Sequence, residues 1–267
     1  MIFKEKYGPI ALIAGASEGM GAAYAHALAA RGMDLVIVAR REKNLTQFAS
    51  GLRAQYPVKI WPLACDLGLP DATQQIQEFI EDRVISFLVY NAALSYIGPF
   101  VDTAAATHLQ IAEVNMLTPM KMVHHFGARM IGEGRGGIVL MSSLAGFQGS
   151  GFLATYAATK AFNRILAEGL WYEWKSKGVD VISCCAGATN TPNYIASNPQ
   201  KITRLAPKPQ MPEQVVEECL SKIGHSPSFI SGRSNKIACF LMNHLFSLKM
   251  SINTMGNTAR KMYGIKA

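Results

Sequence analysis

The segment Ile10-Ala-Leu-Ile-Ala-Gly15-Ala-Ser-Glu-Gly19-Met-Gly21 decides the fold of this chain. Its apolar first half predicts a buried strand, and the alanine-rich run from Ala22 to Arg31 predicts a helix after the glycines. A second apolar strand is predicted over Asp34–Ala39. Strand, glycine turn, helix and strand in this order are typical of half of a dinucleotide-binding domain. Glycines allow the tight turn and the close approach of backbone to a pyrophosphate, which the first N–H groups of the helix can bind.

Two other interpretations of the glycine segment stay open. Gly15 to Gly19 also spells Gly-x-Ser-x-Gly, the pattern of a hydrolase nucleophile elbow. An elbow on the first strand would leave no earlier strand and loop to supply an oxyanion donor, which disfavours this interpretation. A turn with a purely structural role is the second alternative, because a glycine motif on its own is loose.

The rest of the chain continues as alternating helices and strands. Helices are predicted over Glu42–Gln55, Ala72–Asp82, Ala104–Ile131 and Thr155–Trp174. Strands are predicted over Val58–Ala64, Val84–Tyr90, Ile138–Met141 and Val179–Cys185. This order predicts an α/β fold: a Rossmann-like, doubly wound parallel β-sheet with helices on both faces, in a single domain. We expect residues 1–232 to form the dinucleotide-binding catalytic part and residues 233–267 to form a C-terminal helical extension of the same domain.

Composition narrows the function classes. The chain has 267 residues, 49% hydrophobic and 16% charged, which is typical of one globular domain with a sizeable core. The absence of a signal-peptide pattern and of an apolar run of about 18 residues favours a cytoplasmic protein. Five cysteines without zinc spacing predict no metal site. The net charge of +8 comes without a basic cluster interleaved with aromatic residues, which favours an acidic cofactor over nucleic acid.

A second segment, Tyr156-Ala-Ala-Thr-Lys160, indicates proton-transfer chemistry. Tyr156 and Lys160 are four residues apart and therefore share one face of a helix. An ammonium close to a phenol favours the phenolate, so we expect Lys160 to lower the pKa of Tyr156. Ser143, at the end of the predicted strand before this helix, could hydrogen-bond the oxygen of a carbonyl or alcohol.

These motifs together resemble the short-chain dehydrogenase/reductase family over residues 8–232. The family's glycine motif resembles Ala14 to Gly21, and its Asn-Asn-Ala-Gly motif resembles Tyr90 to Ala93. Its Pro-Gly-x-x-x-Thr motif resembles Ala186 to Thr191, and Ser228 to Gly232 resembles the last strand. The resemblance implies a catalytic set of Asn115, Ser143, Tyr156 and Lys160. It implies cofactor binding by Gly15, Ser17, Glu18, Gly19, Met20, Gly21, Arg40, Asp66, Leu67, Asn91, Ala92, Ala93, Tyr156, Lys160, Gly187, Thr189 and Thr191.

The chain departs from the family pattern at Ala14, Tyr90, Ala93 and Ala186. In the family, the turns that hold the first two of these positions brace each other, so we expect the support to be built differently here. None of the four departures removes a catalytic group. They therefore bear on cofactor affinity more than on activity.

The end of the second strand predicts the choice of cofactor. NAD enzymes of this kind carry an acid there to bind the ribose hydroxyls, but this chain has Ala39 followed by Arg40 and Arg41. An arginine suits the 2′-phosphate of NADP, and Ser17 could add a hydroxyl. Glu18 argues against NADP, because many NADP-dependent relatives have a basic residue at that position. We expect NADP, with NAD as the alternative, and assign the phosphate contact to Arg40.

The resemblance implies interconversion of a ketone and a secondary alcohol. Tyr156 would be the general acid in reduction and the base in oxidation, and Ser143 would polarise the carbonyl. Lys160 would bind the nicotinamide ribose, and Asn115 would hold a water that relays protons to Lys160. The alternative for Asn115 is a polar residue that braces a helix bend. The competing function is a non-catalytic nicotinamide-nucleotide-binding protein on the same fold.

The substrate and partners are predicted less directly. Tyr156 to Phe162 and Arg31 to Val36 resemble the long-chain ketoacyl reductase and hydroxysteroid dehydrogenase branch, which favours a bulky apolar ketone or alcohol. The loop Asn193–Met211 falls where the family has a mobile lid. The apolar run Ile237–Leu248 lies in a C-terminal region without acidic residues. A helix over the pocket, an oligomer face and a membrane-surface segment are its open interpretations. The resemblance implies a homodimer or homotetramer.

Overall fold

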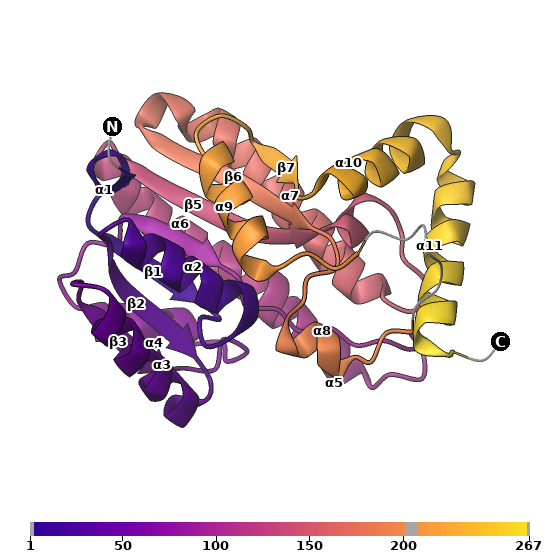
Figure 1. Cartoon of the computed structure of the whole chain (residues 1–267), viewed down its shortest axis with the longest axis horizontal. Helices are drawn as coiled ribbons and strands as arrows, with labels where there is room; N and C mark the ends of the chain where they lie inside the picture. The colour runs from indigo at the N-terminus through magenta and orange to yellow at the C-terminus, as the bar shows by residue number, and fades with distance from the viewer. Residues whose placement is uncertain (1–2, 201–207, 266–267) are drawn as a thin grey trace.

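Parallel strands form one seven-stranded sheet in the computed structural model, which describes residues 3–200 and 208–265 (Figure 1). Within the described residues, the strand order is β3-β2-β1-β4-β5-β6-β7. The strands are β1 Ile10–Ala14, β2 Asp34–Ala39, β3 Ile60–Ala64, β4 Phe87–Tyr90, β5 Gly136–Ser143, β6 Val179–Ala186 and β7 Ser228–Ile230. This confirms the predicted α/β fold with a doubly wound parallel sheet in a single domain.

The apolar runs become strands because central parallel strands are buried on both faces. The bounds of β1 and β2 are as predicted, whereas β4 begins at Phe87 rather than at Val84. The pairing of β4 with β1 begins where Phe87 lies opposite Ala11, and Val84 is exposed outside this ladder. β3 begins at Ile60, which lies opposite Leu35 at the start of its pairing with β2. Strand ends therefore follow the neighbouring strand rather than the apolar run.

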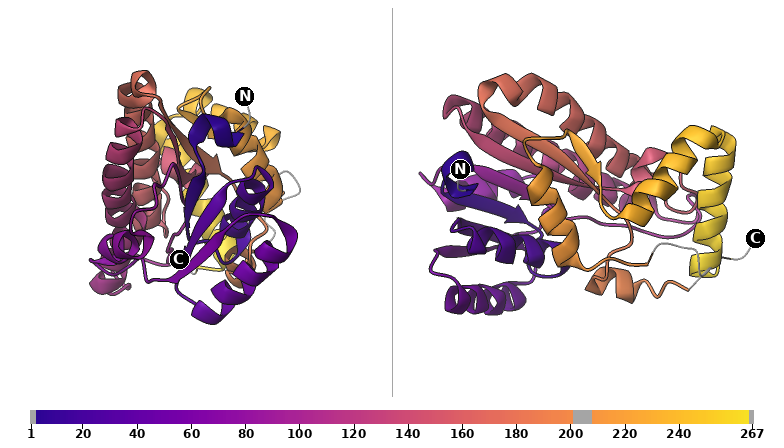
Figure 2. Two further views of the ribbon diagram at one scale, coloured as in Figure 1. Left: turned by 90° about the vertical axis from the view of Figure 1, so that its left-hand side faces the viewer. Right: turned by 45° about the horizontal axis from the view of Figure 1, so that its top comes forward.

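Helices cover both faces of the sheet, as predicted (Figure 2, left). One face packs against α1 Phe3–Tyr7, α2 Gly19–Ala30, α3 Glu42–Gln55 and α9 Pro212–Lys222. The other face packs against α4 Ala72–Ile80, α6 Thr118–Gly132 and α7 Ala154–Trp174. Short 3₁₀ turns η2 Leu144–Phe147 and η3 Lys175–Lys177 precede and follow α7. The helix α1 has no counterpart in the prediction.

The predicted long helix is interrupted. It comprises α5 Ala105–Ala112, a π-helical turn η1 Glu113–Leu117 and α6. Asn115 lies in the π turn. Pro119 has no N–H to donate to the carbonyl of Asn115 four residues earlier, so regular α-helical bonding cannot continue through this point. A π turn inside an α-helix is frequent at functional sites.

The C-terminal part projects from the edge of the sheet at β7 (Figures 1 and 2). It contains α10 Arg233–Phe240, a π-helical turn η4 Leu241–Leu245 and α11 Leu248–Tyr263. The predicted loop Asn193–Met211 begins inside α8 Pro192–Ala196, and its residues 201–207 lie outside the described residues. The N–H of Gln200 donates to the carbonyl of Met262 at 2.8 Å, which joins this loop to α11.

Candidate active site

The strand order reverses between β1 and β4, and this reversal places a crevice at the carboxyl ends of the two strands. Gly15 follows β1, Asn91 follows β4, Ser143 ends β5 and Gly187 follows β6. Residues predicted from four separate segments therefore converge on one edge of the sheet. Ligands of open α/β sheets bind at such a position.

The glycine turn after β1 is tightly packed. Gly15 and Gly19 have φ angles of +83° and +56°, which glycine adopts without strain. A Cβ on Gly21 would lie 1.9 Å from the carbonyl oxygen of Gly15. The side-chain amide of Asn91 donates to that carbonyl at 2.9 Å and so joins the β4 end to the turn. Glu18 is the N-cap residue of α2, and its side chain forms no hydrogen bond with the first N–H groups of this helix. The turn therefore fits a pyrophosphate, which these N–H groups can bind.

Polar groups lie around the entrance to this turn. Ser17 and Met20 are half-buried beside Gly19, and Glu18 is exposed. The Glu18 carboxylate accepts from the Arg41 guanidinium at 2.6 Å. Arg40 is exposed, and within the described residues it forms no ion pair. The ion pair with Arg41 neutralises Glu18, whose charge disfavours NADP, and leaves the Arg40 guanidinium available to a phosphate.

The ends of β3 and β4 hold the next predicted residues. Asp66 is half-buried, and its Oδ1 accepts from the N–H of Gly68 at 2.9 Å. The buried Leu67 accepts from the Thr118 hydroxyl through its carbonyl at 2.9 Å. Ala92 and Ala93 are half-buried, and a Cβ on Gly15 would touch the N–H of Ala92 at 2.7 Å. Backbone here is fixed by packing against the glycine turn.

The loop after β6 closes the other side of the crevice. A Cβ on Gly187 would lie 2.5 Å from the amide of Asn235, so this position also needs glycine. Thr189 is buried and donates to the Gly187 carbonyl at 3.1 Å. Thr191 caps α8 by accepting from the N–H of Tyr194, and a Cβ on Gly19 would lie 3.0 Å from its methyl group. The two ends of the crevice therefore meet at Gly19 and Thr191.

The predicted catalytic side chains lie beyond β5. The Ser143 side chain lies close enough to the Tyr156 hydroxyl to lower the pKa of Tyr156. The Nζ of Lys160 lies 5.6 Å from the Tyr156 ring centroid. Lys160 is only 3% exposed and donates to the carbonyl of Met141 at 2.9 Å. Serine, tyrosine and lysine are thus brought together as predicted.

Asn115 is fully buried and held on all sides. Its side chain accepts from the N–H of Leu94 at 2.8 Å and donates to the Leu94 carbonyl at 2.8 Å. It also donates to the Thr159 hydroxyl at 3.1 Å. Its backbone carbonyl accepts from the Asn163 amide at 3.0 Å. Asn115 therefore ties the segment after β4 to α7.

Burial dominates the proton affinities of the site. It raises the pKa of Tyr156, whereas the neighbouring Ser143 hydroxyl lowers that pKa and the charge of Tyr263 raises it. Burial also lowers the pKa of Lys160 to about 8, with smaller opposing effects of Cys184 and Cys185. Loss of solvent therefore sets the upward direction of the Tyr156 pKa, and the lowering of this pKa by Lys160 stays a prediction.

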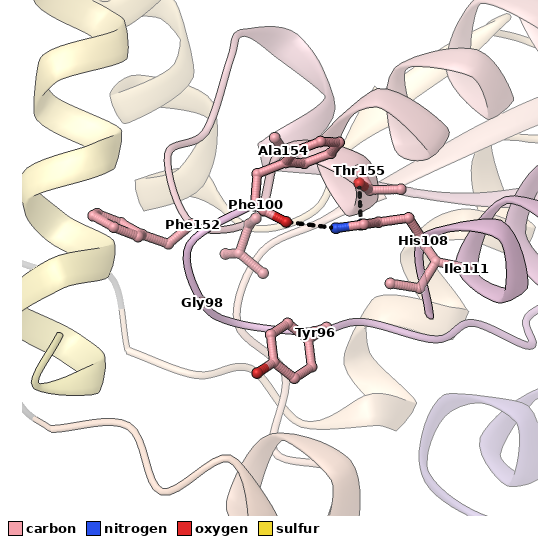
Figure 3. Close-up of a pocket in the computed structure, with 9 residues that line it drawn as sticks. Tyr96, Gly98, Phe100, His108, Ile111, Phe152, Ala154 and Thr155 are labelled. Carbon is pink, nitrogen blue, oxygen red and sulfur yellow. Dashed lines mark hydrogen bonds between the residues drawn. The ribbon is translucent and has the colours of Figure 1, made fainter. Parts of the chain in front are cut away.

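A small pocket beside the site was not predicted (Figure 3). Its lining includes Tyr96 and Phe100 from the segment after β4, His108 from α5, and Phe152 and Thr155 next to Tyr156. The His108 Nε2 donates to the Phe100 carbonyl at 3.0 Å, and the Thr155 hydroxyl pairs with Nδ1 at 2.8 Å. His108 thereby fixes the start of α7. A lone histidine in a helix carries no sequence signal for this contact.

The last helix reaches the same region. Arg260 of α11 lies over the ring of Phe152 at 5.8 Å, and Tyr263 raises the pKa values of both Tyr156 and Tyr194. Gly151 and Gly256 allow the loop before α7 to approach α11 closely. This supports the interpretation of the C-terminal region as a helix over the pocket. The described residues contain no helix long and apolar enough to cross a membrane, and no group of three metal-ligating side chains.

The comparison with known families agrees with this geometry. The family model of short-chain dehydrogenases matches residues 9–202. The chain belongs to the short-chain dehydrogenase family. Members of this family are oxidoreductases that use nicotinamide cofactors, and the match covers the glycine turn, the Ser143–Tyr156–Lys160 group and the loop after β6.

Relatives of this short-chain dehydrogenase confirm the predicted branch. It is 34% identical over 241 residues to a 7beta-hydroxysteroid dehydrogenase of Mediterraneibacter gnavus, which covers 88% of this chain and 90% of the relative. A solved 7beta-hydroxysteroid dehydrogenase structure matches with a TM-score of 0.89 at 31% identity, over 96% of this chain and 99% of the other. A short-chain dehydrogenase of Sphingobium yanoikuyae in complex with NADPH matches with a TM-score of 0.75 at 30% identity, over 84% and 87%.

Proposed function

We propose that this short-chain dehydrogenase is an NADP(H)-dependent oxidoreductase that interconverts a bulky apolar ketone and its secondary alcohol. The observation that carries the proposal is the convergence of Ser143, Tyr156 and Lys160 beside the glycine turn. Hydroxyl, phenol and ammonium lie next to a crevice that fits a dinucleotide. We assign residues 1–232 to the catalytic part and residues 233–267 to an extension of it.

When bound, the nicotinamide supplies or accepts the hydride. Ser143 hydrogen-bonds the substrate oxygen and polarises the carbonyl. Tyr156 gives its proton to that oxygen in reduction and removes it in oxidation. Lys160, with a pKa of about 8, can return a proton to Tyr156 near neutral pH. Asn115 holds the segment after β4 against α7 and so maintains the spacing of these groups.

NADP is proposed over NAD on the charges at the end of β2. Ala39 provides no carboxylate for the ribose hydroxyls, and Arg40 is exposed next to it. A guanidinium suits a phosphate through two parallel hydrogen bonds. The Sphingobium yanoikuyae short-chain dehydrogenase, solved in complex with NADPH, supports this choice.

A bulky apolar substrate is proposed from the surroundings of Tyr156 and from the relatives. Aromatic side chains of Tyr96, Phe100 and Phe152 line the adjacent pocket. Ile195 of α8, four residues after Thr191, is an exposed apolar side chain. The relatives that match most of this chain are 7beta-hydroxysteroid dehydrogenases, and a hydroxysteroid is a bulky, mostly apolar alcohol, which supports this choice.

The test is cofactor oxidation with NADPH and NADH in parallel, over a panel of steroid and other bulky ketones. We expect turnover with NADPH that the Tyr156→Phe variant loses. A faster reaction with NADH would refute the assignment of Arg40 and leave the catalytic group standing. Binding of NADPH, measured by fluorescence, without turnover of any ketone would instead favour the non-catalytic nucleotide-binding protein.

We propose that the protein is cytoplasmic and forms a homodimer or homotetramer. The exposed apolar side chains of Leu109 in α5 and of Ile165 and Tyr172 in α7 support the assembly. Light scattering after size-exclusion chromatography tests this. A monomer at micromolar concentration would contradict it.

We further propose that the turn between α10 and α11 touches an anionic membrane surface. Phe240, Leu245 and Leu248 are exposed there, and the nearest charged side chains, Lys236 and Lys249, are basic. The expected result is flotation with anionic but not with neutral vesicles, which Leu245→Glu abolishes. Equal recovery with both vesicle types, or with none, would contradict the contact.

A further inference from the structure

Asn163 of α7 is a buried polar residue that the predicted catalytic group does not include. It is only 1% exposed and lies three residues after Lys160. Its Nδ2 donates to the carbonyl of Asn115 at 3.0 Å and reaches the carbonyl of Met141 at 3.5 Å. Its Oδ1 is buried and receives no hydrogen bond from the described residues. A buried acceptor of this kind is costly unless a water or ligand satisfies it.

The resemblance assigned a proton-relay water to Asn115, but Asn115 is heavily engaged. Its side chain makes three hydrogen bonds, to Leu94 and Thr159. Its carbonyl cannot receive a bond from Pro119, and the Asn163 amide donates to it instead. The free acceptor in this region of the described structure is therefore Asn163 Oδ1 rather than an atom of the Asn115 side chain.

Lys160 and Asn163 also meet at one atom. The Lys160 ammonium donates to the carbonyl of Met141 at 2.9 Å, and the Asn163 amide reaches the same oxygen. An ammonium has three N–H donors, and the Met141 carbonyl uses one of them. Burial lowers the pKa of Lys160 to about 8, so its proton can be released and replaced near neutral pH. The neutral Lys160 amine then needs a proton donor, and a water held by the unpaired Asn163 Oδ1 would supply that proton.

We propose that Asn163 is a positioning residue for proton transfer, whose Oδ1 holds a buried water that exchanges protons with Lys160. The proposal rests on the proposed ketone reduction. In that direction, Tyr156 gives its proton to the oxygen of the reduced carbonyl, and the Lys160 ammonium reprotonates the tyrosinate. The water then gives a proton to the neutral Lys160 amine and receives one from solvent. Oxidation of the alcohol runs the same transfers backwards.

Two variants test the role in solution. Asn163→Leu keeps a similar volume and removes both polar atoms, and Asn163→Ser keeps a group that can hold water. We expect kcat to fall about tenfold or more in Asn163→Leu, with an increased solvent deuterium isotope effect and NADPH affinity within about twofold of the parent. Asn163→Ser should recover most of kcat. Parental kcat and isotope effect in Asn163→Leu would overturn the proposal.

A purely structural role would give a different result. In that case both variants would lose thermal stability, NADPH affinity and kcat together, without a change in the solvent isotope effect, and the proposal would fail. A high-resolution crystal structure of the unmodified protein tests the water without any variant. Density for a water within about 3.2 Å of Asn163 Oδ1 is expected, and a dry, closed contact there would overturn the proposal.

The two proposals can fail separately. If the unmodified protein turns over no ketone, the proposed function fails, whereas the crystal structure still decides whether Asn163 holds a water. If turnover is normal and the water is absent, only the role of Asn163 fails.

Discussion

The hydroxyl of Tyr90 donates a hydrogen bond of 2.5 Å to the carbonyl of Val114. Tyr90 ends β4 and is fully buried, and Val114 lies in the π turn next to Asn115. The bond therefore connects the sheet, at the crevice, to the residue that holds α7. The departure from the family pattern at Tyr90 thus provides a phenol that hydrogen-bonds the π turn.

Removal of this hydroxyl should affect both stability and catalysis. Tyr90→Phe leaves the Val114 carbonyl buried without its donor, which costs about 1–3 kcal/mol. We expect kcat to fall severalfold as Asn115 loses its fixed position, with little change in KM for NADPH. Tyr7→Phe is the matched control, because Tyr7 is also buried and hydrogen-bonds Asp180, at the opposite end of the sheet. Tyr7→Phe should lose stability without a loss of kcat. Equal losses of kcat in Tyr7→Phe and Tyr90→Phe would refute the role of the Tyr90 hydrogen bond in catalysis.

The glycine turn predicts opposite effects at two glycines of neighbouring helices. Gly21→Ala should destabilise the protein and abolish NADPH binding, because its Cβ would lie 1.9 Å from the Gly15 carbonyl. Gly51→Ala in α3 meets no atom within 4 Å and should stabilise the helix by about 0.5–1 kcal/mol. Chemical unfolding and cofactor fluorescence measure both. An intact cofactor affinity in Gly21→Ala would contradict the packing described here.

Burial of Lys160 predicts that its replacement by an apolar residue raises stability, by an amount that depends on pH, and lowers activity. In the native protein its pKa is about 8, below the ordinary value of 10.5, so burial of the charged form costs stability at neutral pH. Lys160→Met should therefore raise the unfolding temperature at pH 7 while activity falls about a hundredfold. Between pH 8 and 10.5 the lysine is protonated in the unfolded chain and mostly neutral in the native protein. The native state of the parent therefore gains stability as the pH rises through this interval.

The advantage of Lys160→Met should accordingly shrink as the pH rises through that interval. Lys43→Met, at an exposed position of α3, is the control and should show no such pH dependence. A constant difference in unfolding temperature from pH 7 to pH 10.5 would mean that Lys160 is not buried as described.

Cofactor choice should respond to Arg40 and not to its neighbour. Arg40→Ser should raise the KM for NADPH about tenfold or more, because a charge-assisted contact to a phosphate is lost, and leave the KM for NADH nearly unchanged. Arg41→Ser is the matched control, since the Arg41 guanidinium is occupied by Glu18 at 2.6 Å. Parallel kinetics with both cofactors measure the ratio. A larger effect of Arg41→Ser would reverse the assignment.

Much of the fold could be predicted because its signals are local. The strands β1 and β2 are continuous apolar runs closed by glycine or charge, and both bounds of α3 follow the sequence pattern. Tyr156 and Lys160 meet because four residues make one helical turn, which needs no knowledge of the rest of the chain. The order of the motifs then predicted which strand ends would converge.

The remaining features depend on contacts between distant segments. Nothing near Asn163 in the sequence indicates that its amide meets the carbonyls of Asn115 and Met141. The π turn results from Pro119 together with partners on β4 and α7, so a helical pattern alone predicted an unbroken helix. The raised pKa of Tyr156 likewise reflects burial, which the spacing of two residues does not reveal.

The proposed reaction transfers a hydride from a nicotinamide to a carbonyl carbon, with Tyr156 as the proton donor. The test supplies NADPH with deuterium at both C4 positions of the nicotinamide, together with a steroid ketone, and analyses the product by mass spectrometry. We expect an alcohol that carries deuterium at its carbinol carbon, formed about a hundredfold more slowly by Tyr156→Phe. An alcohol without deuterium, or equal rates for both proteins, would contradict it.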